Sequence, residues 1–240
     1  MQQLTEKLVS WLREQVTGAG AHGVVVGMSG GVDSSVAAVL AKRAFPDSTL
    51  GLLLPCHSSQ TDIEHAYLVA NKFQIPTRLI SLDSVFDALL RLLPSGGFDP
   101  ATKKMAEANL KPRLRMATLY YFANRLRYLV IGGGNKCELG VGYFTKYGDA
   151  GVDLLPLGNL VKSQVWELAH YLDIPREIID KPPSAGLWEG QTDEQEMGLT
   201  YEQLDRYFTT GEASQEIRKR IEEKIALNAH KRATPPVPPF

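Results

Sequence analysis

Short apolar runs alternate along the chain with longer stretches in which apolar residues recur at helical spacing. The apolar runs predict strands over residues 24–28, 50–54, 77–80 and 128–131. Their apolar residues are consecutive and do not alternate with polar ones, which is typical of strands that are covered on both faces. The pattern therefore predicts an α/β fold in which a doubly wound parallel sheet carries helices on both faces.

Helical spacing of apolar residues predicts helices over residues 34–44, 62–72, 84–93 and 161–172. Residues 1–16 carry apolar side chains at the same spacing among charged and amide ones, so they predict an amphipathic helix and not a signal peptide. Residues 101–126 form a long helical stretch. We expect a new helix to begin close to Pro112, because proline lacks the backbone N–H that a helix interior needs.

Loop-forming residues separate these elements without indicating a domain boundary. A glycine- and proline-rich cluster at residues 94–100 indicates a connection between the first strand–helix units and the long helical stretch. We therefore expect residues 1–240 to form a single domain. Within it, residues 181–197 predict a flexible polar loop, and residues 233–240 predict a proline-rich tail that is disordered without a ligand.

Charge and cysteine content narrow the classes of function. The 240 residues include 26 basic and 27 acidic side chains, which gives a net charge of -1. This balance argues against nucleic acid as the main partner, since neutralising many phosphates needs an excess of cations. Cys56 and Cys137 form no Cys-x-x-Cys pair, which argues against a disulfide framework or a zinc site. No apolar run approaches the roughly 18 to 20 residues of a membrane span, so we expect a cytoplasmic protein without a membrane partner.

The most informative segment is Gly-Met-Ser-Gly-Gly-Val-Asp-Ser-Ser at residues 27–35, between the first predicted strand and a helix. A glycine turn that leads into a helix binds anions, because the exposed N–H groups and the helix dipole favour negative charge. Gly30 and Gly31 allow the backbone to turn tightly and to approach a phosphate. The serines add hydroxyl donors, so the segment predicts a phosphate-binding loop.

Asp33 distinguishes this loop from better-known phosphate loops. No lysine follows the glycines as in a Walker A loop, and the third glycine of the dinucleotide fingerprint is missing. A carboxylate beside phosphates is repulsive unless a cation lies between them, and Mg²⁺ is commonly held by one or two carboxylates plus substrate phosphates. The plainer alternative is a tight turn in which Asp33 or a neighbour caps the helix.

The loop resembles the SGGxDS pyrophosphate loop of the N-type ATP pyrophosphatases, which split ATP between the α and β phosphates and adenylate a substrate oxygen. Within that superfamily, the chain resembles the ammonia-dependent NAD synthetases from its first helix to Lys231. The motifs that carry this resemblance are residues 109–116, residues 140–157, residues 183–185 with 191–194, and residues 230–232. The resemblance implies an adenine nucleotide alpha hydrolase-like fold.

The same resemblance implies a reaction. ATP adenylates the carboxylate of deamido-NAD with release of pyrophosphate, and ammonia then attacks the activated carbon to give NAD and AMP. Mg²⁺ is the implied cofactor, ATP is a co-substrate, and a homodimer with the dinucleotide at its interface is the implied assembly. The synthetase pattern takes up all 240 residues, so we expect no glutaminase domain. Nitrogen would then come as free ammonia or as ammonia from a separate protein.

Positions that match the family's motifs imply roles for individual residues. The implied ATP contacts are Gly27, Met28, Ser29, Gly30, Gly31, Val32, Asp33, Ser34, Gly133, Lys162 and Ser184. The implied deamido-NAD contacts are Arg113, Lys146, Asp153, His230 and Lys231. Asp33 and Glu138 are the implied magnesium ligands, and Lys162 would stabilise the charge on the departing pyrophosphate. Gly133 stands where the family commonly has threonine, so one hydroxyl contact is absent, whereas Ser184 keeps its hydroxyl.

Several implied roles have plainer alternatives. Asp149 is a candidate for binding ammonium and accepting its proton, but it can equally cap a turn at Gly148. Glu138, Lys146 and Arg113 each have an alternative as a solvated surface charge.

Two other functions are open at this stage. Another N-type ATP pyrophosphatase, such as one that adenylates a tRNA base for thiolation, needs a basic RNA surface and usually catalytic cysteines. The balanced charge argues against a basic RNA surface. Cys137 has no recognisable base beside it and no source of a lowered pKa, which argues against a catalytic cysteine. A nucleotide-sensing module that binds ATP without turnover is disfavoured by the presence of Asp33, Glu138 and Lys162.

Overall fold

The computed structural model describes residues 1–94, 96–97, 99–188 and 190–240. Within this part of the chain, the strands are β1 (Val24–Gly27), β2 (Thr49–Leu53), β3 (Thr77–Leu79) and β4 (Leu129–Ile131). They form one parallel sheet in the order β3-β2-β1-β4. The predicted strands are confirmed, and their ends differ from the prediction by at most one residue.

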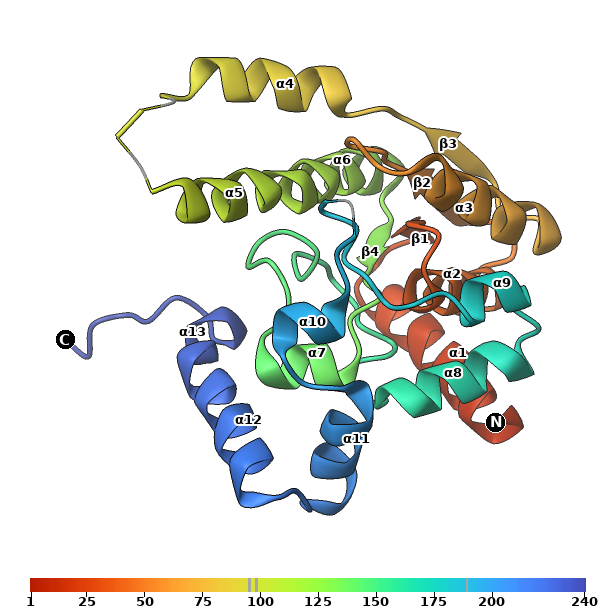
Figure 1. The fold of residues 1–240 in the computed structure, drawn as a ribbon. Coiled ribbons are helices and arrows are strands. Elements are labelled where there is room, and N and C mark those ends of the chain that lie inside the picture. The colour runs from red at the N-terminus through yellow and green to blue at the C-terminus, as the bar shows by residue number, and fades with distance from the viewer. Residues whose placement is uncertain (95, 98, 189) are drawn as a thin grey trace.

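Helices make up most of the remaining structure (Figure 1). The helices of the described residues are α1 (Gln2–Gly18), α2 (Val32–Ala44), α3 (Gln60–Lys72), α4 (Asp83–Leu92), α5 (Pro100–Ala108), α6 (Leu110–Leu126), α7 (Lys136–Val141), α8 (Lys162–Tyr171), α9 (Arg176–Ile179), α10 (Asp193–Met197), α11 (Tyr201–Thr210), α12 (Gln215–Leu227) and α13 (Ala229–Arg232). The predicted helices correspond to α1, α2, α3, α4 and α8. Pro112 lies in the first turn of α6, as expected.

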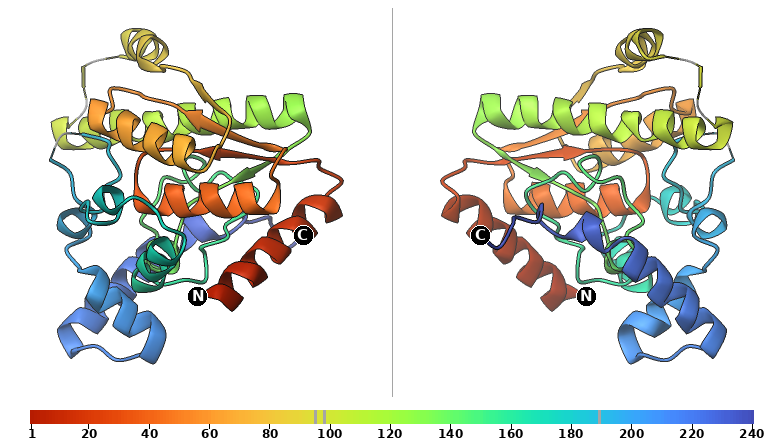
Figure 2. Two further views of the ribbon diagram at one scale, coloured as in Figure 1. Left: turned by 90° about the vertical axis from the view of Figure 1, so that its right-hand side faces the viewer. Right: turned by 90° about the vertical axis from the view of Figure 1, so that its left-hand side faces the viewer.

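Helices cover both faces of the sheet, with α2 on one face and α6 on the other (Figure 2). Val24 and Val26 of β1 pack in a core with α1, α2 and α8, whereas Val25 packs in a second core with α6. Successive side chains of a strand point to opposite faces, so a strand buried on both faces must be apolar throughout. The predicted α/β fold with a doubly wound sheet is therefore confirmed.

A third core lies apart from the sheet, between α7, α8, α11 and α12. Val161, Tyr201, Leu204 and Ile221 are buried in it. This third core holds α11 against the start of α8, where Lys162 lies. No helix among the described residues is long and apolar enough to cross a membrane.

Two loop predictions need correction. Residues 193–197 of the predicted loop at 181–197 form α10, whose first turn is rich in acidic side chains that the helix dipole favours. The connection predicted at 94–100 is one residue shorter in the structure, because α5 begins at Pro100 and proline suits the start of a helix. Ser95 and Phe98 of that connection, and Glu189 of the loop, lie outside the described residues.

The turn between β1 and α2 requires glycine at position 30. Gly30 has a φ of +78°, in the left-handed region that side chains other than glycine rarely adopt. A Cβ at this position would lie 2.2 Å from the backbone oxygen of Asp62 in α3. Any other residue would therefore strain the turn and push α3 away from the loop.

We expect Gly30→Ala to lower the free energy of unfolding by at least about 1 to 3 kcal/mol, the usual cost of such backbone strain. Gly31→Ala is the matched control, because Gly31 has a φ of -93° and a Cβ there would meet nothing closer than Ser29 Oγ at 3.5 Å. Urea unfolding of both variants measures the difference. Equal stability of the two would show that the close approach of α3 is unimportant.

Candidate active site

The carboxyl ends of β1 and β4 meet where the order of the sheet reverses. The chain runs outward from β1 to β2 and β3 and then places β4 on the other side of β1. Ligands of open parallel sheets bind in the crevice at such a reversal. The loop after β1 and the segment after β4 lie side by side here, since a Cβ on Gly133 would be 3.3 Å from the Ser34 nitrogen. We therefore place the candidate active site at this edge.

Serine hydroxyls hold the loop after β1 in shape. The Oγ atoms of Ser34 and Ser35 donate to the Gly31 carbonyl at 2.9 and 2.8 Å. Ser29 Oγ lies 2.9 Å from Ser34 Oγ. Gly31 is the N-cap residue of α2 and has no side chain to satisfy the first N–H groups of the helix. Asp33 does not cap the helix either, so the tight-turn alternative is wrong in that respect and the helix end is available to an anion.

Lys162 at the start of α8 is the buried cation of the site. Its side chain is 1% exposed, and its Nζ forms an ion pair with Asp33 and lies 3.9 Å from Glu138 Oε1. Asn135 Nδ2 donates to the other oxygen of Asp33 at 3.2 Å. Burial disfavours the ammonium, but the two carboxylates outweigh it and raise the pKa of Lys162 above its usual value. Residues from α2, α7 and α8 thus meet at one buried charge cluster.

Glu138 is held in place by the start of its own helix. Asn135 is the N-cap of α7, where it accepts from the Glu138 N–H at 3.1 Å, while Glu138 Oε2 accepts from the Asn135 N–H at 3.1 Å. This reciprocal pair is a capping box. Burial and the nearby carboxylate of Asp33 raise the pKa of Glu138 to about 8, against the lowering effect of Lys162. The alternative of a solvated helix acid is wrong for Glu138.

The charge cluster includes residues for which no role was predicted. Tyr201 OH lies 3.0 Å from Glu138 Oε1 and 2.9 Å from Asp193 Oδ2. Asp193 is 4% exposed, and burial raises its pKa. Asp205 accepts from the Lys162 N–H at 3.0 Å. The Asn-x-x-Glu spacing of Asn135 could have been recognised as a capping box, but contacts made by Tyr201 and Asp205 depend on tertiary packing and leave no local signal.

The carboxylates of Asp33 and Glu138 have the chemistry that a magnesium ion needs. They face one cation, the Lys162 ammonium, beside a loop suited to phosphate. Among the described residues, no group of three or more acidic, histidine or cysteine side chains could hold a metal without outside help. A metal here would therefore need phosphate oxygens to complete its coordination, which is the way Mg²⁺ is usually bound. The donor set fits magnesium.

A second group of cations comes together where α13 packs against residues 140–147. Lys146 Nζ donates to the His230 carbonyl at 2.6 Å, and Arg113 lies 3.4 Å from the Lys146 carbonyl. Lys231 Nζ donates to the carbonyls of Gly142 and Phe144 at 2.9 and 3.0 Å. Three segments distant in sequence thus bring together Arg113, Lys146, His230 and Lys231. In this group, no ammonium or guanidinium is held by a carboxylate in the ion pairs of the described residues.

Asp153 is engaged elsewhere. Its Oδ2 accepts from the Val130 N–H at 2.8 Å and its Oδ1 accepts from Tyr120 OH at 3.0 Å. These bonds tie the segment after residue 150 to β4 and α6, and they give Asp153 a structural role in the chain as it stands. Its predicted contact with deamido-NAD stays a prediction.

Asp149 and Ser184 hold local turns. Asp149 Oδ1 accepts from the Thr145 N–H at 2.8 Å, in a turn closed by the bond from Gly148 N–H to the Thr145 carbonyl at 2.9 Å. The turn-capping alternative for Asp149 is therefore observed. Ser184 Oγ accepts from the Gly186 N–H at 3.1 Å. The roles of both residues toward ammonium and ATP stay predictions.

The loop that carries Ser184 is attached to the helices beside the phosphate loop. Lys181 forms an ion pair with Asp62, the α3 residue whose carbonyl packs on Gly30. Lys111 Nζ donates to the Leu187 carbonyl at 2.7 Å from the start of α6. The two ends of this stretch therefore lie against α3 and α6, on the side of the sheet edge where ATP is expected.

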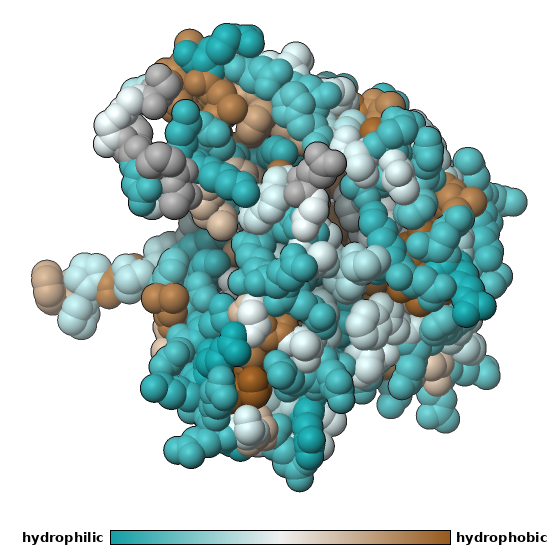
Figure 3. Space-filling model, viewed as in Figure 1, coloured by the Kyte–Doolittle hydropathy of each residue, from teal (hydrophilic) through white to brown (hydrophobic). Residues whose placement is uncertain are grey.

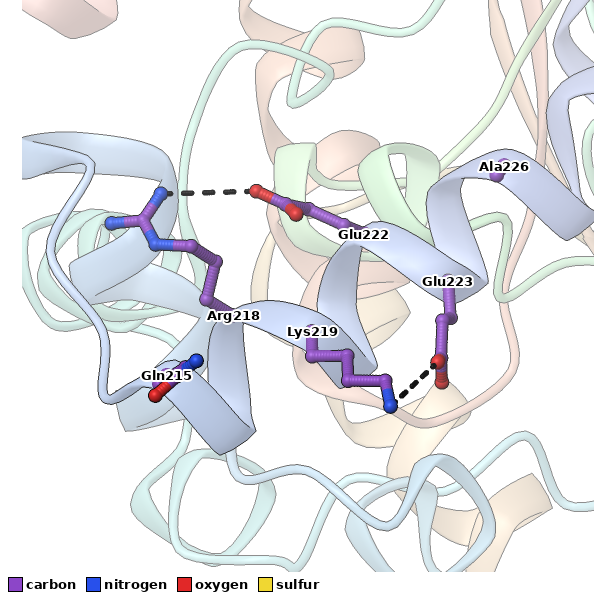
Figure 4. Close-up of a pocket in the computed structure, with 6 residues that line it drawn as sticks. All are labelled: Gln215, Arg218, Lys219, Glu222, Glu223 and Ala226. Atoms are coloured by element: carbon purple, nitrogen blue, oxygen red, sulfur yellow. Dashed lines mark ion pairs between the residues drawn. The ribbon is translucent and has the colours of Figure 1, made fainter.

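A shallow surface pocket on α12 is not part of this site (Figure 4). Its charged side chains pair along the helix, with Arg218 3.8 Å from Glu222 and Lys219 3.9 Å from Glu223. Such exposed pairs are worth little, and they leave no charge for a ligand. We assign no function to this pocket.

Comparison with known proteins agrees with the geometry. The NAD synthase family model matches residues 4–235. The chain is 52% identical to the NH(3)-dependent NAD(+) synthetase of Carboxydothermus hydrogenoformans, over 99% of this chain and 97% of that protein. It is 43% identical to the NH(3)-dependent NAD(+) synthetase of Methanocaldococcus jannaschii, over 99% of this chain and 97% of that protein.

Solved structures show the same likeness. The NMN synthetase from Francisella tularensis superposes with a TM-score of 0.94 at 40% identity, over 100% of this chain and 98% of that one. The NH3-dependent NAD synthetase from Campylobacter jejuni, in complex with nitrate, gives a TM-score of 0.81 at 28% identity, over 98% of each chain. Together with the matching family model, these relatives establish that the chain belongs to the NAD synthase family.

Proposed function

We propose that the chain amidates the carboxylate of deamido-NAD with ammonia at the expense of ATP, in NAD biosynthesis. The observation that carries this proposal is the convergence of Asp33, Glu138 and Lys162 beside a glycine-serine loop at the reversal of the sheet. Two acids and one cation beside a phosphate-binding loop support a site for a triphosphate and its metal. Relatives at 52% identity carry the name of the same activity.

A carboxylate must be activated before ammonia can attack it, because it is a poor electrophile. The loop after β1 would hold the ATP phosphates by its N–H and hydroxyl groups. Magnesium, held by Asp33 and Glu138, would neutralise phosphate charge. Lys162 would stabilise the negative charge that accumulates on the departing pyrophosphate, and its burial keeps that interaction strong. Catalysis would then rest on position and electrostatics.

The second group of cations would hold the anionic dinucleotide. Arg113, Lys146 and Lys231 donate to backbone carbonyls and not to carboxylates, so phosphates can replace these weaker acceptors. Asp149 lies near Lys231, whose positive charge favours the carboxylate form of Asp149. We assign Asp149 the capture of ammonium and the acceptance of its proton.

A homodimer in the cytoplasm is the assembly that we propose. Apolar side chains on α4 and at its C-cap are exposed, with Val85 at 51%, Leu92 at 82% and Leu93 at 46%, and the space-filling view shows brown atoms over this helix (Figure 3). Such a patch supports burial against a second copy. Cys56 and Cys137 are both free thiols, which suits a reducing compartment.

The mononucleotide that corresponds to deamido-NAD is a second candidate substrate. The Francisella tularensis protein that superposes at a TM-score of 0.94 is called an NMN synthetase. The mononucleotide and the dinucleotide share the nicotinate carboxylate that is amidated and differ in the AMP half. Steady-state kcat/KM for the two acids separates the alternatives: a ratio above 10 in favour of deamido-NAD supports the first proposal, and the reverse ratio supports the mononucleotide.

Free ammonia, not glutamine, is expected to supply the nitrogen. Purified protein with ATP, Mg²⁺, deamido-NAD and ammonium should release NAD and AMP in equal amounts, and glutamine in ammonium-free buffer should not replace ammonium. Burial and the bond to Asp205 raise the pKa of Cys137, so its thiol is not a nucleophile at neutral pH. Sustained NAD formation from glutamine, abolished by Cys56→Ala or Cys137→Ala, would contradict this prediction. Binding of ATP without AMP release would support the nucleotide-sensing alternative instead.

Asp33→Asn and Glu138→Gln are each expected to lower kcat by about 100-fold or more at limiting Mg²⁺, because each removes a carboxylate that would hold the metal beside the phosphates. The variants keep the size of the side chains, so circular dichroism should show an unchanged fold. Wild-type rates in both variants would show that the metal assignment is wrong.

Lys146→Ala is expected to raise KM for deamido-NAD about 10-fold or more and to change KM for ATP by less than about twofold, because Lys146 belongs to the group of cations around α13 and not to the charge cluster around Lys162. The matched control is Lys219→Ala, which removes an exposed lysine from α12. A fall in melting temperature with unchanged KM values would instead assign Lys146 a structural role.

A further inference from the structure

Tyr201 connects the charged groups of the phosphate site, although it belongs to none of the sequence motifs. It is the first residue of α11, and its side chain is buried, at 1% exposure. Its hydroxyl lies 3.0 Å from Glu138 Oε1 and 2.9 Å from Asp193 Oδ2, and the ammonium of Lys162 lies 4.8 Å from the centre of its ring. One side chain therefore contacts the proposed metal ligand, the buried cation and a second buried acid.

The start of α11 fixes where the phenol points. Thr200 and Gln203 form a capping box there, with bonds of 3.2 and 3.0 Å. The Tyr201 N–H donates to Glu194 Oε1 of α10 at 2.8 Å, and the rings of Tyr201 and Trp166 pack in a T-shaped arrangement with their centroids 6.2 Å apart. The backbone and the ring are thus both held, so the hydroxyl has little freedom to leave the two carboxylates.

The next turn of α11 holds the same lysine by its backbone. Asp205 lies four residues after Tyr201, on the same face of the helix. Its oxygens accept from the N–H groups of Lys162 and Ser163 at 3.0 and 2.7 Å. These bonds cap α8 at its first turn. Tyr201 and Asp205 therefore fix the side chain and the backbone of Lys162 from one helix.

The chemistry of the phenol suits this position. A phenol is protonated at neutral pH, so the Tyr201 hydroxyl, 3.0 Å from Glu138 Oε1, can donate a hydrogen bond to that carboxylate. A donor aimed at a carboxylate that binds a metal fixes which oxygen faces the metal, and such outer contacts tune metal affinity. The face of the ring attracts the ammonium without competing for its hydrogen bonds to phosphate.

We propose that Tyr201 is a positioning residue that orients Glu138 for magnesium and Lys162 for the pyrophosphate of ATP. It acts through these two residues and does not touch the reacting atoms. The inference rests on the proposed function, because it takes Glu138 as a metal ligand.

The contacts of Asp193 extend this network toward the loop that carries Ser184. Asp193 Oδ1 accepts from Tyr143 OH at 3.1 Å, and the same hydroxyl lies 2.8 Å from Glu196 Oε2. Gln191 Nε2 in turn donates to Glu196 at 2.5 Å. Loss of the Tyr201 hydroxyl therefore removes the contact with Asp193 Oδ2 but none of the contacts that Tyr143 and Gln191 make on the loop side.

The test is Tyr201→Phe, which keeps the ring over Lys162 and removes only the hydroxyl. Mn²⁺ serves as the metal probe, and its dissociation constant is measured by electron paramagnetic resonance with a non-hydrolysable ATP analogue bound. We expect this constant, and the Mg²⁺ concentration for half-maximal velocity, to rise about 10- to 100-fold. KM for deamido-NAD should change by less than about twofold. Tyr207→Phe is the matched control, because its hydroxyl, on the same helix, lies 3.5 Å from Glu222 and not in the site.

A metal affinity within about twofold of wild type in Tyr201→Phe, with only a lower melting temperature, would overturn the inference and leave Tyr201 a structural role. Tyr201→Met is the second variant, should the first fail to fold, and it should lose at least as much metal affinity. Failure of the proposed function is distinguishable, because the wild-type protein would then neither bind Mn²⁺ with the ATP analogue nor form NAD.

Discussion

The ion pair of Lys162 with Asp33, close to Glu138, is the interaction on which the rest of the site depends. An ammonium that is 1% exposed cannot be buried alone, because desolvation of an unpaired charge is costly. Its partners come from the starts of α2 and α7, and α8 supplies the lysine itself. Removal of Asp33 would leave the buried ammonium without its direct partner, so the positions of the helix ends that meet at Lys162 depend on one another. That constraint assembles the phosphate site before any ligand arrives.

The doubly wound sheet supplies the frame for this cluster. β1 and β4 are neighbours, so the segments that follow them meet at one edge even though Asp33 and Asn135 are 102 residues apart in sequence. Glycine at positions 30 and 133 then lets backbone approach backbone. The third core anchors α11 against α7 and α8, and Tyr201 and Asp205 complete the surroundings of Lys162 from outside the sheet. The geometry of the charged cluster therefore depends on where a small number of helices begin.

Sequence patterns predicted the sheet and the phosphate loop because both leave local signals. Strands buried on both faces must be continuously apolar, and a glycine turn before a helix has few other uses. The group of Arg113, Lys146 and Lys231 was found through resemblance to a family, not through any pattern within its own segments. Tyr201 could not be predicted, since an aromatic residue at a helix start usually belongs to the core. Its role depends on the packing of α11 against α7, which no local pattern encodes.

The position of α10 was missed for a related reason. Its five residues are too few to show helical periodicity, and the acidic side chains of Asp193 and Glu194 resemble those of a polar loop. The role of these acidic residues depends on tertiary packing, because Asp193 is buried against Tyr143 and Tyr201. Asp153 illustrates the opposite case, in which a residue with a role implied by resemblance is bound to β4 and Tyr120 in the structure.

The most direct test of the account follows one oxygen atom through the reaction. Deamido-NAD labelled with ¹⁸O in both carboxylate oxygens is incubated with the protein, ATP, Mg²⁺ and ammonium, and the AMP is analysed by mass spectrometry. Adenylation forms a bond between a carboxylate oxygen and the α phosphorus, and attack by ammonia breaks the bond between that oxygen and carbon. The account predicts one ¹⁸O in each AMP and one in each NAD. AMP without label, or label in inorganic phosphate released with ADP, would contradict it.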